Sequence, residues 1–140
     1  MCSPAQEESR LTDERIEVDG IVGRAVRMVS LYGGVQIEVG TIGTSERFRL
    51  RVESPGELTD TSGKVRPFVP LEIGATDEVA TLLGSLLGAV VSDLDVRAGG
   101  SIRIAFSNGI VICVPPGKWE AWEFHTPSGH FISLPGGGLA

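Results

Sequence analysis

The stretch TDEVATLLGSLLG, residues 76–88, is the most strongly helical segment of the 140-residue chain, and the rest is arranged around it. Thr76 is placed to act as an N-cap, and Asp77 and Glu78 put negative charge in the first turn. Gly88 supplies the stop. Apolar residues recur between them at three- and four-residue spacing: Val79, Leu82, Leu83, Leu86 and Leu87. This stripe predicts a helix over 76–88 that packs on a sheet and carries no chemistry of its own.

Two similar β-rich halves flank this helix. In the first half, the alternation of VQIEV at 35–39 and ERFRLRV at 46–52 predicts half-buried strands. After the helix, Gly88, Val91, Leu94, Val96, Gly100, Ile102 and Ile104 echo Gly23, Val26, Val29, Leu31, Gly34 or Val35, Ile37 and Val39. We therefore predict an internal duplication of a three-strand antiparallel meander.

Glycine-containing turns set the register of these meanders. The predicted three-residue loops occupy 32–34, 98–100 and 107–109, each with its last glycine in a left-handed conformation. Two-residue turns would instead bring polar residues onto the core face. The expected opposing pairs are Leu31 with Val35, Val96 with Ile102, and Phe106 with Ile110.

The remaining segments complete the predicted architecture. Residues 54–74 are rich in Pro and Gly and predict a loop-like crossover, of which 57–64 is the expected mobile loop. Residues 119–125 and 131–134 flank a turn and predict a C-terminal hairpin with Trp122 and Phe124 facing the core. We predict a disordered acidic arm at 1–15, a single α+β domain at 16–135 and a flexible tail at 136–140. The domain comprises the two meanders, one packed helix and the hairpin.

Composition narrows the class of partner. A formal charge of −6 and a pI near 4.9 argue against a nucleic-acid partner, which needs clustered Lys and Arg. The chain opens without a secretory signal, and its longest apolar run, 82–91, is too short to span a bilayer. We expect a cytoplasmic protein that does not enter a membrane. Cys2 in the acidic arm and Cys113 in a predicted strand predict no structural disulfide.

Residue types with catalytic or ligand-binding potential occur without the spacing that such sites need. His125 and His130 lie five residues apart with Cys113 upstream, but they lack the close pairs typical of zinc sites. The glycine-rich segments do not match a phosphate-binding pattern. Strand alternation places Asp93 with Asp95, and Glu120 with Glu123, on solvated faces where little would raise a carboxyl pKa. We expect no metal, no cofactor and no catalytic residue.

Three arginines and two tryptophans are candidates for surface recognition. Arg47, Arg49 and Arg51 form a basic stripe that would suit nucleic acid or an acidic partner, but we favour cross-strand pairing with Glu38 and Glu46. On an extended strand Trp119 and Trp122 lie on opposite faces, which makes the outward Trp119 a candidate interface anchor.

The C-terminal sequence GKWEAWEFHTPSGHFISLPGGGLA resembles the end of a family of small actinobacterial proteins known as a domain of unknown function, family 6188. The similarity includes Trp119, the Glu-Ala-Trp-Glu run at 120–123, the Pro-Ser-Gly turn and the Leu-Pro-Gly-Gly run at 134–137. It extends over about the last sixty residues. The chain departs from the pattern at 138–140, where the family has an acidic residue and a terminal aromatic. The resemblance implies no established activity. It does imply a likeness to immunity proteins or antitoxins of polymorphic toxin systems.

Our leading functional hypothesis is a non-enzymatic protein-binding module that neutralises a partner protein, such as a basic toxin domain, by occlusion. Its predicted contact residues are Trp119, Glu120, Glu123 and His125. One alternative is a small hydrolase-type enzyme that uses His125 or His130 with a nearby carboxylate. Another is a structural subunit that adds strands to a homo-oligomeric sheet.

Overall fold

The computed structural model describes residues 14–40, 46–117 and 120–140, and these form a mostly β structure with one short α-helix. The first strands along the chain are β1 (Arg15–Ile16), β2 (Val26–Ser30), β3 (Val35–Gly40), β4 (Arg47–Val52), β5 (Gly56–Thr59) and β6 (Val65–Phe68). A 3-10 helix η1 (Pro70–Glu72) and the helix α2 (Glu78–Gly84) follow. The last strands are β7 (Val91–Arg97), β8 (Ile102–Phe106), β9 (Val111–Val114), β10 (Trp122–Thr126) and β11 (Gly129–Ile132).

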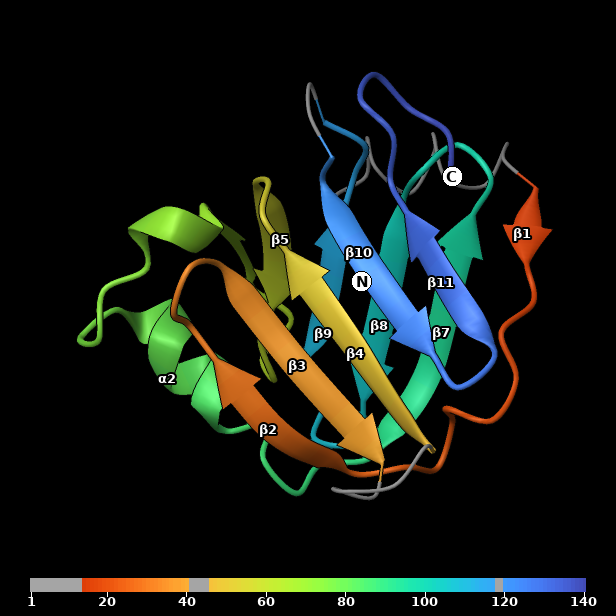
Figure 1. Ribbon diagram of the computed structural model, residues 1–140. Helices are drawn as coiled ribbons and strands as arrows, with labels where there is room; N and C mark the ends of the chain where they lie inside the picture. Colours follow the sequence, from red (N-terminus) through yellow and green to blue (C-terminus); the bar gives the residue numbers. More distant parts are fainter. Residues whose placement is uncertain (1–13, 41–45, 118–119) are drawn as a thin grey trace.

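The strands form two antiparallel sheets that lie face to face (Figure 1). One sheet has six strands in the order β1-β7-β8-β9-β5-β6, and the other has five in the order β11-β10-β4-β3-β2. Helix α2 lies at one side of the pair, near β2 and β3 (Figure 1). The α+β class predicted from the sequence is therefore reasonable, although the helical part is small.

Each sheet contains one run of three consecutive antiparallel strands. These runs are β2-β3-β4 and β7-β8-β9, and they fall where the sequence predicts the two meanders. Val96 pairs with Ile102, as predicted. The Ser30–Gln36 and Ala105–Val111 pairs place the next residues of each strand, Leu31 with Val35 and Phe106 with Ile110, opposite one another as expected. The predicted positive φ is confirmed at Gly34, Gly100 and Gly109, and Gly33 adopts one as well. A common origin of the two runs by duplication stays a prediction.

The helix is shorter than predicted and begins differently. It ends at Gly84 because glycine is unfavourable within a helix, and the chain continues in tighter turns with Leu86 N–H bonded to Leu83 C=O at 3.1 Å. The N-cap is Asp77 and not Thr76, and the Asp77 carboxylate accepts the Gly74 N–H at 2.7 Å instead of capping the helix. Leu83 and Leu86 enter the core, but Leu87 is 57% exposed, so the predicted stripe is one residue too wide.

Residues 54–74 contain a β-hairpin, so the prediction of a loop-like crossover is wrong. Strands β5 and β6 pair with each other, and β5 also pairs with β9. The hairpin turn is held by Asp60, whose carboxylate accepts hydrogen bonds from the Ser62 hydroxyl at 2.5 Å and the Lys64 N–H at 3.0 Å. A side-chain oxygen that accepts the turn amides in this way takes the place of a backbone carbonyl and stabilises the turn.

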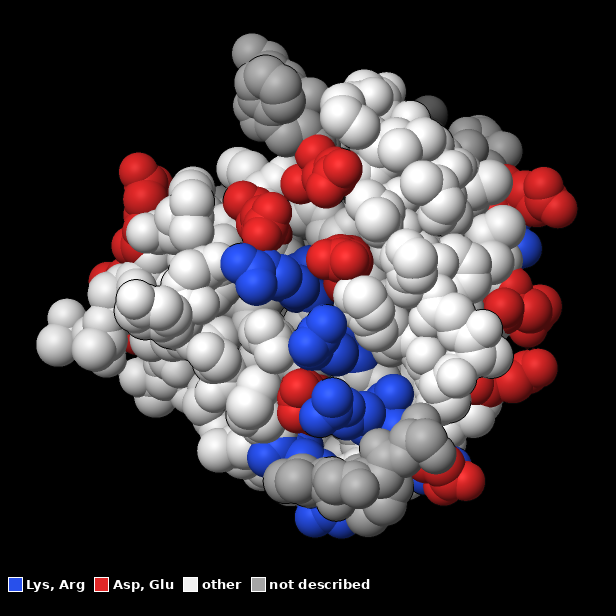
Figure 2. Space-filling view, viewed as in Figure 1, with Lys and Arg blue, Asp and Glu red and all other residues white. Residues whose placement is uncertain are grey.

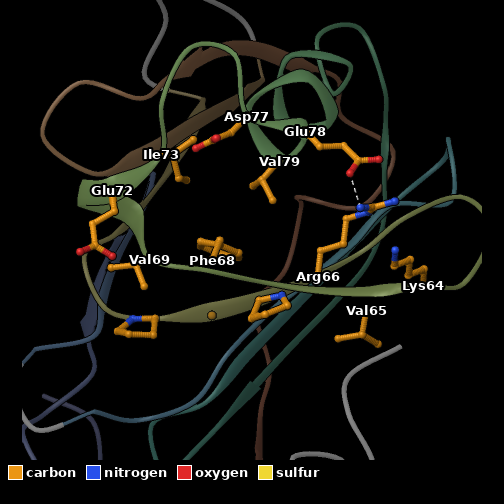
Figure 3. A pocket seen from close by; sticks show the side chains of 13 residues that line it. Lys64, Val65, Arg66, Phe68, Val69, Glu72, Ile73, Asp77, Glu78 and Val79 are labelled. Atoms are coloured by element: carbon orange, nitrogen blue, oxygen red, sulfur yellow. Dashed lines mark hydrogen bonds and ion pairs between the residues drawn. The ribbon is translucent and has the colours of Figure 1, made fainter.

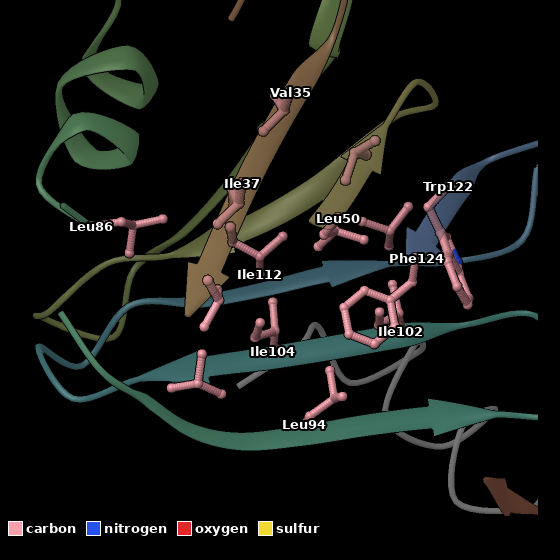
Figure 4. Close-up of a cluster of buried hydrophobic side chains, with 14 of the residues drawn as sticks. Val35, Ile37, Leu50, Leu86, Leu94, Ile102, Ile104, Ile112, Trp122 and Phe124 are labelled. Carbon is pink, nitrogen blue, oxygen red and sulfur yellow. The ribbon is translucent and has the colours of Figure 1, made fainter. Parts of the chain in front are cut away.

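One hydrophobic core fills the space between the sheets (Figure 4). Alternate residues point inward, so that Leu50, Trp122 and Phe124 from one sheet meet residues such as Ile102 and Ile104 from the other. The predicted inward position of Trp122 is confirmed, since it is 1% exposed. Its indole N–H donates to the Gly100 carbonyl at 2.8 Å, which satisfies the polar atom of a buried tryptophan.

Both ends of the described chain contact the sheets. At the N-terminal end, the backbone of β1 pairs with β7, which places Arg15 opposite Arg97 in the sheet. Residues 1–13 of the expected acidic arm lie outside the described residues. At the other end, Gly138 N–H bonds to Gly99 C=O at 2.8 Å and Leu139 packs against the core. The predicted C-terminal hairpin is confirmed as β10 and β11.

Cys113 is buried in β9 and is disulfide-bonded, contrary to the expectation of no structural disulfide. The expectation for Cys2 falls outside the described residues. The cysteine usage therefore no longer supports the expected cytoplasmic location. Within the part of the chain that the structure describes, no helix has the length and apolar character needed to cross a membrane.

Candidate functional site

The outer face of the five-stranded sheet carries most of the residues that the sequence singles out. Strand alternation produces this face, because Phe48, Leu50 and Val52 of β4 are buried while the arginines between them point outward. In β10, Glu123 and His125 alternate with the buried Trp122 and Phe124 in the same way. Figure 2 shows a basic stripe along the middle of this face, with acidic side chains gathered at one end.

The strand registers arrange these side chains in two rows across the sheet. One row runs through Glu38, Arg49, His125 and His130, on β3, β4, β10 and β11. The next runs through Gln36, Arg51, Glu123 and Ile132 on the same strands. Neighbours within a row have Cβ atoms about 5 Å apart, close enough for a partner to contact several of them at once. The face is therefore mainly polar and charged, with Ile132 at the end of one row.

An acidic cluster forms one end of the face. Glu53, Glu120 and Glu123 surround Arg51, and with Trp122 these residues line one small depression. Arg51 Nε lies 2.8 Å from Glu53 Oε1, and its Nη2 donates to the Gly33 carbonyl at 3.2 Å. One guanidinium among three carboxylates leaves this end negative. The structure thus brings together Glu120 and Glu123, two of the predicted contact residues.

The basic stripe is only partly neutralised by neighbouring acids. Arg47 Nη1 lies 3.8 Å from Glu38, as the predicted cross-strand pairing requires, and Glu46 pairs with Arg24 at 3.3 Å. Arg49 makes no ion pair or hydrogen bond with any residue in the described part of the chain. Exposed pairs of this kind are worth less than about 1 kcal/mol, so the stripe remains available to a partner.

The two histidines meet on this face. Their rings stack with centroids 5.4 Å apart, and His125 Nε2 lies 2.9 Å from Glu123 Oε1. His130 also borders a hollow of about 360 Å³, together with Thr126 and Ser128. A histidine oriented by a carboxylate has the chemistry of a general base. His125, however, lies only partly buried on the outer surface of β10, where water is not excluded as it is in a closed active site. The described residues include no group of three or more His, Cys, Asp and Glu side chains arranged to hold a metal ion.

Two other candidates, the Trp119 anchor and the Asp93–Asp95 pair, lie away from these clusters or outside the described residues. The predicted anchor Trp119 lies outside the described residues, so its contacts stay a prediction. The prediction that Asp93 and Asp95 lie on a solvated face is wrong for Asp95, which is only 7% exposed. It pairs with Arg97 at 2.8 Å, while Asp93 pairs with Arg103 at 3.0 Å, because the outer face of the six-stranded sheet carries an ion-pair network.

Sequence reasoning missed a hollow of about 630 Å³ between β6 and the η1–α2 segment (Figure 3). The Pro and Gly content of residues 54–74 favours a loop and conceals the strand that forms one wall of this hollow. The run from Val65 to Phe68 carries only a weak strand signal, since a period of two puts Arg66 and Phe68 on the same face and Pro67 argues against a central strand.

Comparison with known proteins identifies a family but no characterised relative. Neither the curated proteins nor the solved structures contain a significant match to this chain. The model of a family of unknown function, DUF6188, matches residues 18–140. The match extends well beyond the C-terminal residues that carry the resemblance in the sequence. This chain therefore belongs to the DUF6188 family over nearly its whole length.

Proposed function

We propose that this protein is a non-enzymatic protein-binding module and that the outer face of the five-stranded sheet is its contact surface. The observation that carries the proposal is the acidic cluster of Glu53, Glu120 and Glu123 at one end of a broad charged face. Clustered surface charge steers an oppositely charged partner and selects against wrong ones. The partner that fits this cluster is a basic protein surface, and a toxin domain occluded by an immunity protein is one such case.

A charge-reversal variant tests the proposal. Glu120→Lys/Glu123→Lys removes the negative end of the face, and Glu14→Lys/Glu17→Lys serves as the matched control. The control changes the net charge equally at two exposed positions outside the acidic cluster. Each full chain is immobilised and incubated with lysate of the native host, and the retained proteins are identified by mass spectrometry. We expect one partner retained by the wild type and the control but lost from the face variant.

Binding kinetics with the recovered partner sharpen the test. Association with the face variant should be slower than with the control, and the difference should shrink at high salt because screening weakens long-range steering. Equal loss of the partner from both variants would show that net charge alone matters and would remove this face. Failure of the wild type to enrich any protein over an unrelated acidic bait would contradict the binding function itself.

A second candidate, a hydrolase-type enzyme, is favoured by the 2.9 Å approach of Glu123 to His125. A carboxylate that orients an imidazole is one part of a nucleophile-activating site. The assay is hydrolysis of p-nitrophenyl esters by the wild type and by His125→Ala. Turnover that disappears in His125→Ala, with partner binding retained, would favour the enzyme over the binding module.

A further inference from the structure

The hollow beside β6 is separate from the charged face and has the properties of a binding groove. Its volume of about 630 Å³ falls within the range of pockets that bury small ligands and peptide side chains. Phe68 lies in the middle, and Val79 and Ile73 face it from the opposite wall (Figure 3). All of the residues that line it belong to the described part of the chain.

One wall of this groove is the free edge of a sheet. Strand β6 is the last of the six, and among the described strands it pairs only with β5. Asp60 N–H bonds to Lys64 C=O at 2.9 Å. Hydrogen-bonded and non-hydrogen-bonded pairs alternate along an antiparallel ladder, so the backbones of Arg66 and Phe68 also bond to β5. The backbone N–H and C=O groups of the residues between and after them, Val65, Pro67 and Val69, therefore point to the open edge.

The edge is suited to a short added strand and not to open-ended sheet growth. Val65 offers both an N–H and a C=O, whereas Pro67 offers only its C=O. Val69 offers only its N–H to a partner strand, because its C=O already accepts the Glu72 N–H at 2.9 Å. A proline in an edge strand blocks indiscriminate pairing, so recognition must also use the side-chain groove.

Charge is distributed unequally along the groove. Arg66 is neutralised by Asp60, at 3.0 Å, and by Glu78. Lys64, whose ammonium has no hydrogen-bond or ion-pair partner among the described residues, lies at the start of β6. Glu72 lies at the opposite end of the groove (Figure 3). A ligand that follows the edge therefore meets a base at one end and an acid at the other.

We propose that this groove binds an extended peptide segment of a partner protein as an additional strand antiparallel to β6. Antiparallel pairing continues the existing sheet and is the more stable arrangement. The segment carries a basic residue on its N-terminal side, next to Glu72, and an acidic residue on its C-terminal side, next to Lys64. Apolar side chains between them occupy the hollow above Phe68.

Two synthetic peptides of identical composition test the proposal. The first is acetyl-Lys-Thr-Leu-Thr-Leu-Thr-Glu-amide, in which Lys, both Leu and Glu share one face of an extended strand, and the second exchanges its terminal Lys and Glu. Each is titrated into the ¹⁵N-labelled full chain and followed by two-dimensional NMR. We expect the first peptide to bind at least tenfold more tightly than the second and to shift the amide signals of Val65, Val69 and Val79.

Three variants separate the groove from its surroundings. Val79→Trp fills the hollow and should abolish binding, whereas Leu87→Trp places the same side chain at an exposed position outside the groove and should leave binding intact. Lys64→Glu changes an exposed residue and should weaken binding of the first peptide at least tenfold.

Several results would overturn the proposal. Equal binding of the two peptides, binding that survives Val79→Trp, or no shifts up to millimolar peptide would each exclude a directional peptide groove. A concentration-dependent mass that Val79→Trp abolishes would assign the edge to a second copy of this chain. None of these results depends on the charged face, so the two proposals fail separately.

Discussion

Trp122 shows how a single side chain links the two sheets. It projects from β10 of the five-stranded sheet, and its indole N–H reaches the Gly100 carbonyl in the turn between β7 and β8 of the other sheet. The same carbonyl accepts a hydrogen bond from the buried Ser133 hydroxyl at 2.9 Å. The turn at Gly100 is thus bonded to two residues of the C-terminal hairpin region.

Replacement of this tryptophan measures that link. Trp122→Ala should lower the free energy of unfolding by about 3–5 kcal/mol, the usual cost of emptying a large buried aromatic site. Trp122→Phe should cost less, because part of the volume remains and Ser133 still satisfies the Gly100 carbonyl. Urea titrations of the three proteins give the comparison. A loss below about 1.5 kcal/mol for the alanine variant would contradict the buried position.

Two glycines with similar backbones separate conformational strain from steric contact. Gly100 has φ +98° and Gly109 has φ +90°, so alanine at either site should cost about 1–2 kcal/mol from the left-handed conformation alone. A Cβ at Gly100 would also lie 2.8 Å from the Gly138 carbonyl oxygen, whereas one at Gly109 would meet nothing closer than 3.8 Å. We expect Gly100→Ala to lower the thermal midpoint clearly more than Gly109→Ala. Equal shifts would mean that the C-terminal segment around Gly138 moves aside freely.

At the scale of elements, the β5–β6 hairpin depends on the charge of one carboxylate. The Ser62 hydroxyl, then the Lys64 amide and the Arg66 guanidinium, hold the pKa of Asp60 well below its ordinary value, against the opposing effect of burial. Arg66 also pairs with Glu78, so the same network ties the hairpin to α2. Both walls of the groove are therefore anchored through Asp60.

This network predicts a pH dependence with a defined sign. Because the folded pKa of Asp60 is below its unfolded value of about 3.9, its contribution is fully present above that pH and is lost as the pH falls further. We expect the unfolding free energy of the wild type to fall more steeply below about pH 4 than that of Asp60→Asn. Denaturant titrations at several acidic pH values measure both slopes. Parallel slopes would show that Asp60 is not stabilised as a carboxylate.

An element can be predicted from the sequence when the pattern that specifies it is local to its own residues. The meander strands β3 and β4 were predictable because each has a local alternation, and β9 because it is a short apolar run that follows a glycine turn. The end of the helix at Gly84 was harder, since the apolar spacing continues to Leu87 and only packing decides which residues are covered. Strand β1 has only two residues and depends on β7, so no local pattern announces it.

The whole molecule combines the two sheets in ways that sequence patterns do not contain. The acidic cluster joins Glu53, at the end of β4, to Glu120 and Glu123 through a strand pairing between distant segments. The sequence identified Glu120 and Glu123 by proximity in the chain but could not add Glu53 or place Arg49 beside His125. Long-range register is set by the packing of the complete core, which local alternation leaves open.

The shared core predicts that the two sheets unfold together. Ile104 of the six-stranded sheet is 1% exposed within the cluster that also contains Trp122, so Ile104→Ala should cost about 2–5 kcal/mol for the whole domain. Tryptophan fluorescence, to which Trp122 contributes from the opposite sheet, and far-UV circular dichroism should then shift to the same lower urea midpoint. The exposed Val22→Ala is the control and should change stability by less than about 0.5 kcal/mol. A fluorescence midpoint that stays at the wild-type value while the dichroism signal shifts would mean that the two meanders unfold separately, contrary to a single domain.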